Sequence, residues 1–368
     1  MIHNETVLAI AANFDLGGVP VGIKELTAGN INQTYRLDMG EGANAPHYVL
    51  QRINTVAFKD PVSLMENIGL VTSHIRRGYE AEGIDPTRRA LTFAAAKNGT
   101  LLYTDPEGGA WRAYVYVDEV TAYDTIESAE LFYEAGRGFG EFQTRLADFP
   151  AEKLSETIPG FHDTARRYET FLASVEKDAA GRVADLTEEI EFFRSRRSLM
   201  SSIVEKLGKE LPLRVTHNDT KLNNVLMDNQ TGKALCVIDL DTVMPGSALY
   251  DYGDAVRYGA STAAEDEPDT SKIGFDMSLF EAFTKGFVGA TAGNLTDTEI
   301  KLLPLGIAVI TCELAMRFLT DYIDGDVYFK TLYEGHNLVR ARAQMKLLCE
   351  VEAKLDEMYG YVEKLLNA

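Results

Sequence analysis

The chain has few of the residues that cross-link small extracellular proteins or bind zinc. Its 368 residues include three cysteines, six histidines and one tryptophan. The cysteines, Cys236, Cys312 and Cys349, are odd in number and far apart, without the spacing of metal ligands. We therefore expect reduced, structural thiols, and neither a disulfide framework nor a cysteine-based metal site.

Long apolar runs and basic residues are also scarce. No run of about 18 uncharged apolar residues is present, and the first residues lack the basic and apolar regions of a secretory signal. Lys and Arg number 36 against 56 Asp and Glu, a formal net charge of -20. Nucleic acids and anionic membranes attract basic surfaces. We expect a cytoplasmic protein with neither of these as a partner.

What is present suits a two-lobed enzyme. An apolar content of 45% over this length provides a large core and favours two domains. A helix at residues 4–14 is followed by alternating segments at 19–25, 32–38 and 48–53, typical of an antiparallel sheet, and by a helix at 61–77. From Ala129 the apolar period becomes helical. We predict an α+β protein with an N-lobe at 1–117 and a helical C-lobe at 118–368. Further strands are expected at 92–95 and 111–117, and helices at 166–178, 186–207, 278–286, 297–323 and 340–366.

The most informative motif runs from His217 to Asn224. Asp219 precedes Asn224 by five residues, the spacing of the protein-kinase catalytic loop, in which the Asp accepts the proton of the attacking hydroxyl and the Asn holds magnesium. Each residue alone has a structural alternative, such as capping a turn. The set, flanked by predicted strands and followed by a strand that ends in Asp239, predicts phosphoryl transfer. We expect His217 to brace the loop.

A hairpin is predicted to bring the two metal ligands together. Residues 229–232 supply turn residues between two apolar strands. If the centre of the hairpin lies between Thr231 and Gly232, Asn224 and Asp239 are equidistant from it and face each other. Oxygen ligands from an Asn and an Asp, completed by phosphates and water, suit Mg²⁺.

These motifs resemble the aminoglycoside phosphotransferase and choline kinase superfamily, which has a protein-kinase-like fold. Within it the chain is most similar to the N-acetylhexosamine 1-kinases, and the similarity runs nearly end to end. The strings that carry it are 29–32 (GNIN), 48–54 (YVLQRIN), 216–224 (THNDTKLNN), 238–247 (IDLDTVMPGS), 249–254 (LYDYGD), 258–262 (YGAST) and 336–340 (HNLVR).

The resemblance implies a phosphotransferase with an alcohol acceptor. By this resemblance the enzyme is expected to use ATP and Mg²⁺ to convert N-acetylglucosamine or N-acetylgalactosamine to the α-1-phosphate. The expected ligands are this sugar and ATP, and the expected state is a monomer. Arg317 and Tyr328 match sugar-contacting positions. The alternative for Arg317 is ordinary helix ion pairs with its i-4 and i+4 neighbours, Glu313 and Asp321. Two further sugar contacts are predicted. Asp241 lies two residues past Asp239, on the same side of an extended segment, and Asn30 lies in the turn between the first two strands.

The nucleotide contacts are less defined by the sequence. Gly29, between the first two strands, could let backbone amides approach the phosphates, although a plain turn explains it equally. The third strand offers Gln51 and Arg52 where kinases place a lysine. Arg52 is a candidate replacement, and Lys221 a candidate for contacting the γ-phosphate. The hinge that holds adenine is predicted at residues 114–120, with Tyr116 and Val117 at its centre.

One glycine motif is misleading. Gly136, Gly138 and Gly140 mimic a phosphate loop but lie in an apolar-periodic helix, which indicates close helix packing.

Three alternative functions remain. Another small-molecule kinase of the superfamily, acting on an amino alcohol, homoserine or a different sugar, would keep every motif. An aminoglycoside-modifying enzyme is also open. The missing lysine leaves a nucleotide-binding pseudokinase as the alternative of a different class.

Overall fold

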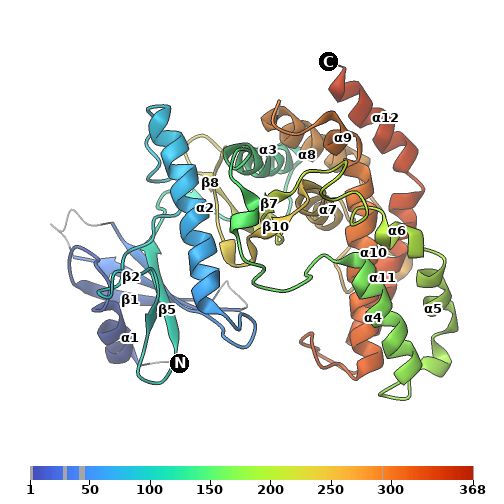
Figure 1. The fold of residues 1–368 in the computed structure, drawn as a ribbon, viewed down its shortest axis with the longest axis horizontal. Helices are drawn as coiled ribbons and strands as arrows, with labels where there is room; N and C mark the ends of the chain where they lie inside the picture. The colour runs from blue at the N-terminus through green and yellow to red at the C-terminus, as the bar shows by residue number, and fades with distance from the viewer. Residues whose placement is uncertain (1–2, 28–30, 41–45, 292, 368) are drawn as a thin grey trace. The chain divides into compact units, whose positions relative to one another are not determined.

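The structure is a computed structural model that describes residues 3–27, 31–40, 46–291 and 293–367. Two compact units make up the chain. Unit 1 comprises residues 1–122, 153–158 and 226–244, and unit 2 comprises residues 123–152, 159–225 and 245–368. An antiparallel sheet in unit 1 and a mainly helical unit 2 confirm the predicted α+β class (Figure 1). The lobe boundary at 117/118 stays a prediction.

The sheet of unit 1 has the strand order β1-β2-β3-β5-β4. Successive neighbours pair antiparallel, with Gln51 opposite Thr34 on one side and opposite Arg112 on the other. Its strands and the two helices of this part of the chain are β1 (Pro20–Leu26), β2 (Gln33–Met39), β3 (Tyr48–Arg52), β4 (Tyr103–Thr104), β5 (Ala110–Val115), α1 (Asn4–Ala11) and α2 (Pro61–Ala81).

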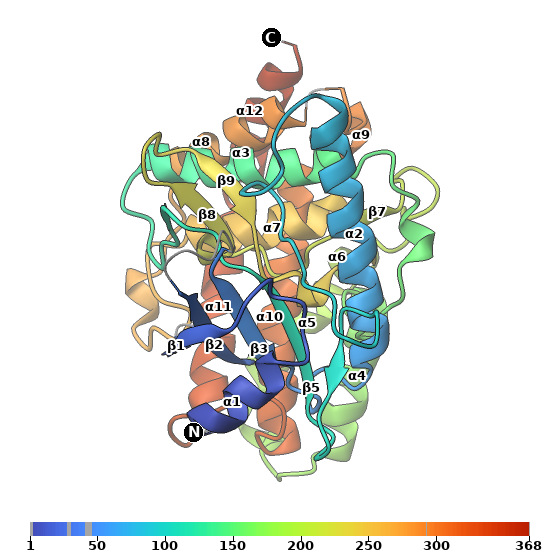
Figure 2. The same ribbon diagram turned by 90° about the vertical axis from the view of Figure 1, so that its left-hand side faces the viewer.

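The two faces of this sheet have different roles. α1 lies across one face, where Val7 joins a buried cluster with Leu50 and Trp111 (Figure 2). Because side chains alternate along a strand, Gln51 and Arg112 point to the opposite face. The register therefore separates an apolar face, packed on α1, from a face that carries polar groups.

A second, three-stranded sheet has the order β6-β8-β9, with β6 at Val120–Thr121, β8 at Val225–Asp228 and β9 at Ala234–Val237. At its hairpin Gly232 N–H donates to Asp228 O (2.8 Å) and Asp228 N–H donates to Lys233 O (2.9 Å). Asp228 thus faces two residues, and Gly232 takes the positive φ of 67° that such a bulge requires. The centre therefore lies one residue before the expected point. Neither Asn224 nor Asp239 belongs to a paired strand, so strand pairing does not place them opposite each other.

Unit 2 is built around the apolar helix α10, which contacts α4, α7 and α11. Its elements are α3 (Ala129–Arg145), α4 (Thr164–Lys177), α5 (Thr187–Arg194), α6 (Arg197–Ser201), β7 (Arg214–Thr216), α7 (Ala248–Gly259), α8 (Met277–Ala290), α9 (Asp297–Lys301), α10 (Leu303–Asp324), α11 (His336–Glu352) and α12 (Leu355–Leu366), with β10 (Met244–Gly246) pairing with β7.

Glycines allow α3 and α8 to pack backbone to backbone. A Cβ on Gly136 would lie 2.3 Å from Phe283 O, and one on Gly140 would lie 2.6 Å from Phe287 O. From the other side, a Cβ on Gly286 would lie 2.1 Å from Tyr133 O. These distances are far below van der Waals contact, so only glycine fits. The interpretation of the Gly136–Gly140 motif as a packing device is confirmed.

Three of the expected long helices are broken in the structure. Residues 186–207 form α5 and α6 because Arg196 leaves helical geometry, stacks on Phe192 (3.6 Å to the ring centroid) and forms an ion pair with Glu352 (2.7 Å). Residues 297–323 restart at Leu303, where Pro304 occupies the first turn. α11 begins earlier than predicted, at His336, and α12 is separate from it. The expected strand at 92–95 is reduced to an isolated bridge, and α7 was not predicted.

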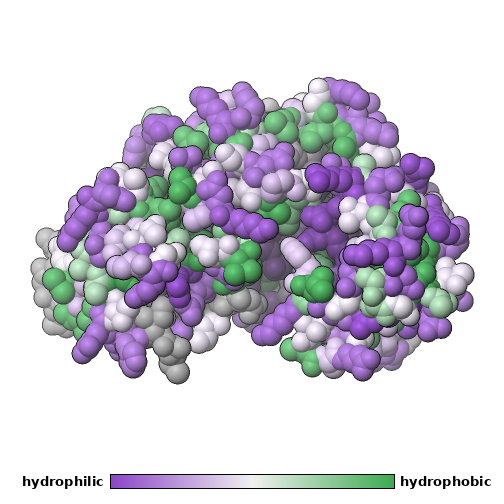
Figure 3. Space-filling model, turned by 60° about the horizontal axis from the view of Figure 1, so that its bottom comes forward, coloured by the Kyte–Doolittle hydropathy of each residue, from purple (hydrophilic) through white to green (hydrophobic). Residues whose placement is uncertain are grey.

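On the face drawn in Figure 3 hydrophilic side chains predominate and the hydrophobic patches are scattered. By length and composition, α10 is the one candidate for a membrane span among the described residues. Most of it is buried inside unit 2, as expected for the central helix of a folded domain.

Candidate active site

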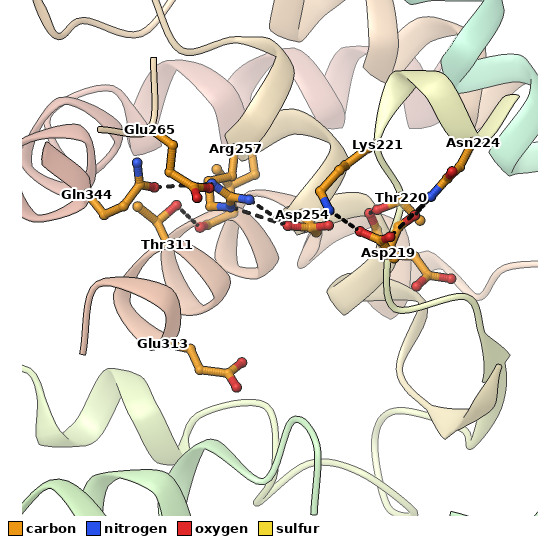
Figure 4. A network of polar contacts seen from close by, with 12 residues as sticks. Asp219, Thr220, Lys221, Asn224, Asp254, Arg257, Glu265, Thr311, Glu313 and Gln344 are labelled. Atoms are coloured by element: carbon orange, nitrogen blue, oxygen red, sulfur yellow. Dashed lines mark hydrogen bonds and ion pairs between the residues drawn. The ribbon is translucent and has the colours of Figure 1, made fainter. Parts of the chain in front are cut away.

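The predicted catalytic loop follows β7 and ends in the short 3₁₀ helix Leu222–Asn224. Asn224 Nδ2 donates to the backbone oxygen of Asp219 (2.8 Å) and to its Oδ2 (3.2 Å), which closes the loop on itself (Figure 4). The Asp219 side chain is 27% exposed, so solvent reaches it. The two residues that the spacing identified therefore lie in direct contact.

Asp251, in the first turn of α7, holds this loop in place. Its Oδ2 accepts from the backbone N–H of His217 (2.8 Å) and its Oδ1 from that of Asn218 (2.8 Å). Gln143 Nε2 also donates to Oδ2 (2.9 Å), and Thr220 Oγ1 donates to the Asp251 backbone oxygen (2.6 Å). The pKa of Asp251 is raised, because the effect of burial exceeds that of His217 and the backbone N–H groups, which favour the carboxylate.

His217 is completely buried, with its ring edge-on to Phe139 and Phe142 (both 5.8 Å between centroids). Its Nδ1 accepts from the Asp219 N–H (3.3 Å). These contacts match the expected bracing role. Asn218, between the two, has a φ of 64°, a conformation that is costly for a residue with a side chain and is common at functional sites.

Lys221 pairs with the predicted base: its Nζ lies 2.7 Å from Asp219 Oδ1. Burial lowers the pKa of Lys221, but Asp219, then Asp254 and Glu265, raise it by more, so the net shift is upward. Figure 4 shows Asp254 between Lys221 and Arg257. Arg257 Nη2 lies 2.9 Å from Asp254 Oδ1, and its Nη1 lies 3.0 Å from Glu265 Oε2. A row of alternating charges thus extends from Asp219 along α7.

The two predicted magnesium ligands lie in different units, and each is described by itself. Asn224 uses its Nδ2 inside the loop, which leaves the amide oxygen, the atom a hard cation requires. Asp239 follows β9 with a φ of 59°. Both donors fit a magnesium ion by their chemistry. Among the described residues no group of three His, Cys, Asp or Glu side chains is placed to hold a metal, so protein ligands of this kind alone do not form a cage.

Asp241, predicted to bind sugar, is buried in unit 1. Its Oδ1 accepts from Arg112 Nη1, and its Oδ2 accepts from Asn32 Nδ2 (2.6 Å). Arg112 is itself buried, and its Nε donates to Gln51 Oε1 (2.9 Å). The proximity of the two charges was not predicted, because they are 129 residues apart.

The predicted nucleotide contacts of unit 1 lie at separate places. Arg52 points to the α1 side of the sheet, over Trp111 (5.9 Å to the centroid). Tyr116 donates its N–H to His47 O (2.8 Å), and Val117 beside it is buried. Gly29 and Asn30 lie outside the described residues.

Arg317 and Tyr328, predicted from the resemblance, are in contact in unit 2. The guanidinium carbon of Arg317 lies 5.7 Å from the Tyr328 ring centroid, 5.4 Å from that of Phe329 and 5.5 Å from that of Phe161. Neither Glu313 nor Asp321 forms an ion pair with Arg317. The helix ion pairs expected under the alternative interpretation are therefore not formed.

The carboxylate of Glu313 is used elsewhere. His162 Nδ1 lies 2.7 Å from its Oε2 and Arg167 Nε lies 2.7 Å from its Oε1. Burial raises the pKa of Glu313, but His162, Arg167 and Arg317 lower it by more. The His162 ring also stacks at 4.9 Å on Tyr250, the neighbour of Asp251. This cluster therefore adjoins the element that holds the catalytic loop.

Comparison with known proteins agrees with this geometry. Residues 22–275, more than half of the chain, match the phosphotransferase enzyme family. The chain belongs to this family. A microcompartment-associated aminopropanol kinase has a TM-score of 0.64 and 17% identity, with 97% of this chain and 98% of that chain covered. The Plasmodium vivax ethanolamine kinase has a TM-score of 0.55 and 13% identity, with 88% of this chain and 82% of that chain covered. Spectinomycin phosphotransferase, solved with ADP and spectinomycin, has a TM-score of 0.58 and 12% identity, with 95% of this chain and 99% of that chain covered.

Membership of the phosphotransferase family makes the chain a small-molecule kinase with a protein-kinase-like fold. Sequence reasoning missed Asp251, Arg112, Glu313 and His162. The string LYDYGD, which contains Asp251, carried the resemblance but no role. For Arg112 the available signal was that it is a basic residue in β5, the strand that pairs with β3, where the kinase lysine is missing. For Glu313 and His162 the local sequence offers no signal, because their contact joins α10 to the residues before α4.

Proposed function

We propose that this phosphotransferase transfers the γ-phosphoryl group of ATP to the anomeric hydroxyl of N-acetylglucosamine or N-acetylgalactosamine. The product is the α-1-phosphate. The contact of Arg317 with Tyr328 carries the assignment of the acceptor class, since among the described residues Arg317 forms no ion pair with a carboxylate. It combines with the long strings that the chain shares with N-acetylhexosamine 1-kinases.

The charge of the Arg317 cluster supports a neutral acceptor. Glu313 is in contact with His162 and Arg167, and the charge of Arg317 also acts on it, while the Asp321 carboxylate accepts from the backbone N–H groups of Tyr328 and Phe329. Aminopropanol and ethanolamine, for which two of the compared kinases are named, carry an ammonium group at neutral pH. The guanidinium groups of Arg167 and Arg317 repel an ammonium group, whereas guanidinium N–H groups and a tyrosine hydroxyl suit sugar hydroxyl and acetamido oxygens. The proposed contacts are Arg317 and Tyr328, with Asp241 and Asn30 as further candidates.

Asp219 performs the proton transfer in this proposal. It orients the anomeric hydroxyl and takes its proton, while the hydroxyl oxygen forms a bond to the γ-phosphorus and the bond from that phosphorus to the leaving oxygen of ADP breaks. Asn224 and Asp251 keep the loop in the geometry that this attack requires. Lys221, which pairs with Asp219, is the proposed contact to the γ-phosphate.

Nucleotide and metal binding complete the proposal. Asn224 and Asp239 are the proposed ligands of Mg²⁺, which when bound neutralises phosphate charge. Tyr116 and Val117 form the proposed hinge, and Gly29, outside the described residues, stays a candidate from the sequence for contacting the phosphates. Because Tyr116 N–H already donates to His47, its carbonyl oxygen and the Val117 N–H are the groups available to adenine.

The test is ADP release with magnesium ATP on a panel of N-acetylglucosamine, N-acetylgalactosamine, glucose, galactose, choline, ethanolamine, homoserine and kanamycin. Turnover on the N-acetylhexosamines with a non-reducing product, lost by at least about 100-fold in Asp219→Asn, is the expected result. Arg317→Met should raise KM for the sugar and leave KM for ATP unchanged.

The other outcomes discriminate among the alternatives. Turnover only on choline, ethanolamine or homoserine discards the sugar assignment and keeps the base. Turnover on kanamycin alone identifies an aminoglycoside-modifying enzyme. Nucleotide binding without turnover on any acceptor supports a pseudokinase. Chelation with EDTA should abolish turnover, and added Mg²⁺ should restore it.

A further inference from the structure

Where kinases carry a lysine on the third strand, unit 1 has Gln51 on the polar face of the sheet and Arg52 on the α1 face. In protein kinases that lysine contacts the α- and β-phosphates and pairs with a glutamate of the following helix. Here α2, the corresponding helix, presents Met65 toward the polar face of the sheet, while Glu66 is exposed. Neither partner of the usual ion pair is therefore present at its position.

A buried ion pair lies beside these two positions. Arg112 stands directly opposite Gln51 in the β3–β5 register, its Nε donates to Gln51 Oε1 (2.9 Å), and its Nη1 contacts both Asp241 and Met65 Sδ (3.8 Å). Its guanidinium thus occupies the same face and the same level of the sheet as Gln51. Arg52, the candidate from the sequence, points to the α1 face and is not part of this group.

Carboxylates compensate the charge of Arg112 but leave one edge of its guanidinium open. Asp241 balances Arg112, and Asp239 also acts electrostatically on it. Burying a charge is costly, so an arginine that is 3% exposed must be compensated by specific partners. Among the described residues, Nη2 of Arg112 has no hydrogen-bond partner, so one edge of the guanidinium remains available for a ligand.

We propose that Arg112 is the phosphate anchor of this kinase. Held by Asp241 and Gln51, its guanidinium contacts the α- and β-phosphates of the nucleotide in place of the third-strand lysine. The inference rests on the proposed function only for the use of ATP and is independent of the acceptor. It also gives Asp241 a defined role, as the counter-ion that the helix glutamate supplies in protein kinases.

The test measures nucleotide affinity by calorimetry, without acceptor, in the presence of Mg²⁺. ATP, ADP and adenosine are titrated into the wild type, Arg112→Met, Arg112→Lys and the matched control Arg52→Met. Loss of a charge-assisted contact should weaken ATP and ADP by about 10- to 100-fold in Arg112→Met and leave adenosine unchanged. Arg112→Lys should retain part of the affinity, and Arg52→Met all of it. A purely structural role would weaken adenosine together with ATP.

Because Arg112→Met leaves Asp241 uncompensated, two further variants guard against misfolding. Arg112→Gln with Asp241→Asn removes both charges and should lose ATP affinity while it unfolds cooperatively. Gln51→Lys with Arg112→Gln moves the cation to the adjacent strand and should recover ATP affinity. Wild-type ATP affinity in the folded neutral pair, or equal losses in Arg52→Met, would overturn the assignment of Arg112. Absence of ATP binding by the wild type would overturn the nucleotide part of the proposed function as well.

Discussion

Lys221 Nζ lies 2.7 Å from Asp219 Oδ1, so the proposed base and the proposed γ-phosphate ligand neutralise each other. If Asp219 is the base and Lys221 binds the γ-phosphate, as proposed, loss of Lys221 changes both the charge beside the base and the binding of the phosphate.

This coupling predicts a specific kinetic and pH behaviour for Lys221→Met. The variant should lose at least about 10-fold in kcat. The folded-state pKa of Lys221 is raised above its ordinary value of 10.5, so the stability from the pair is fully present below 10.5 and is lost only as pH rises through the higher folded value. The wild-type rate should therefore show no loss attributable to Lys221 between pH 6 and about 10. A basic limb in that range, absent from Lys221→Met, would contradict this prediction.

Replacement of Asp251 should damage the geometry of the catalytic loop. In Asp251→Asn an amide faces the N–H groups of His217 and Asn218, so two buried donors lose their charged acceptor. We expect a loss of about 100-fold in kcat with a smaller change in KM for ATP, and a stability cost of roughly 3 kcal/mol. Steady-state kinetics and urea unfolding measure both. The control is Asp276→Asn, at the N-cap of α8, which should change stability by about 1 kcal/mol or less and leave kcat unchanged.

Glu313→Gln should destabilise unit 2 in a pH-dependent manner. The variant removes the charge that His162 and Arg167 share, at a cost of about 3 kcal/mol at pH 7. Since the pKa of Glu313 is lowered from 4.5, its contribution is present above pH 4.5 and is lost as pH falls through the folded value.

The measurement is the difference in free energy of unfolding between wild type and Glu313→Gln from pH 3 to pH 8. The exposed pair of Glu191 with Arg194 (3.9 Å) provides a control, because Glu191→Gln should change stability by less than about 0.5 kcal/mol throughout. A difference for Glu313→Gln that stayed constant into the acid range would refute the charged pairing.

Two glycines of α8 offer a matched pair for the packing argument. Gly286→Ala places a Cβ 2.1 Å from Tyr133 O and should destabilise the protein by about 1–3 kcal/mol. Gly289→Ala, three residues along the same helix, meets nothing within 4 Å and should be neutral or stabilise by up to about 1 kcal/mol. Urea unfolding of the two variants decides, and equal effects would be inconsistent with backbone contact between α3 and α8.

The sequence predicted those features that depend on local spacing. The contact of Asp219 with Asn224 lies within one loop, and the first three strands begin and end within about two residues of their expected bounds. Features that depend on distant partners were missed. At Arg196, where the expected helix is interrupted, the side chain pairs with Glu352, 156 residues away in the sequence. The bulge at Gly232 shifted the hairpin by one residue, because turn type is not fixed by composition.

The direct pairing of Gln51 with Arg112 across two strands has a consequence for how kinase-like chains are classified. A survey that marks a chain as inactive when one aligned column lacks lysine inspects a single strand. Residues that are directly paired on adjacent strands present their side chains to the same face of the sheet. A cationic residue can therefore be carried by either strand and still reach the same site. Genome surveys of degenerate kinases should therefore score a cross-strand row of residues, in which this chain has a positive charge.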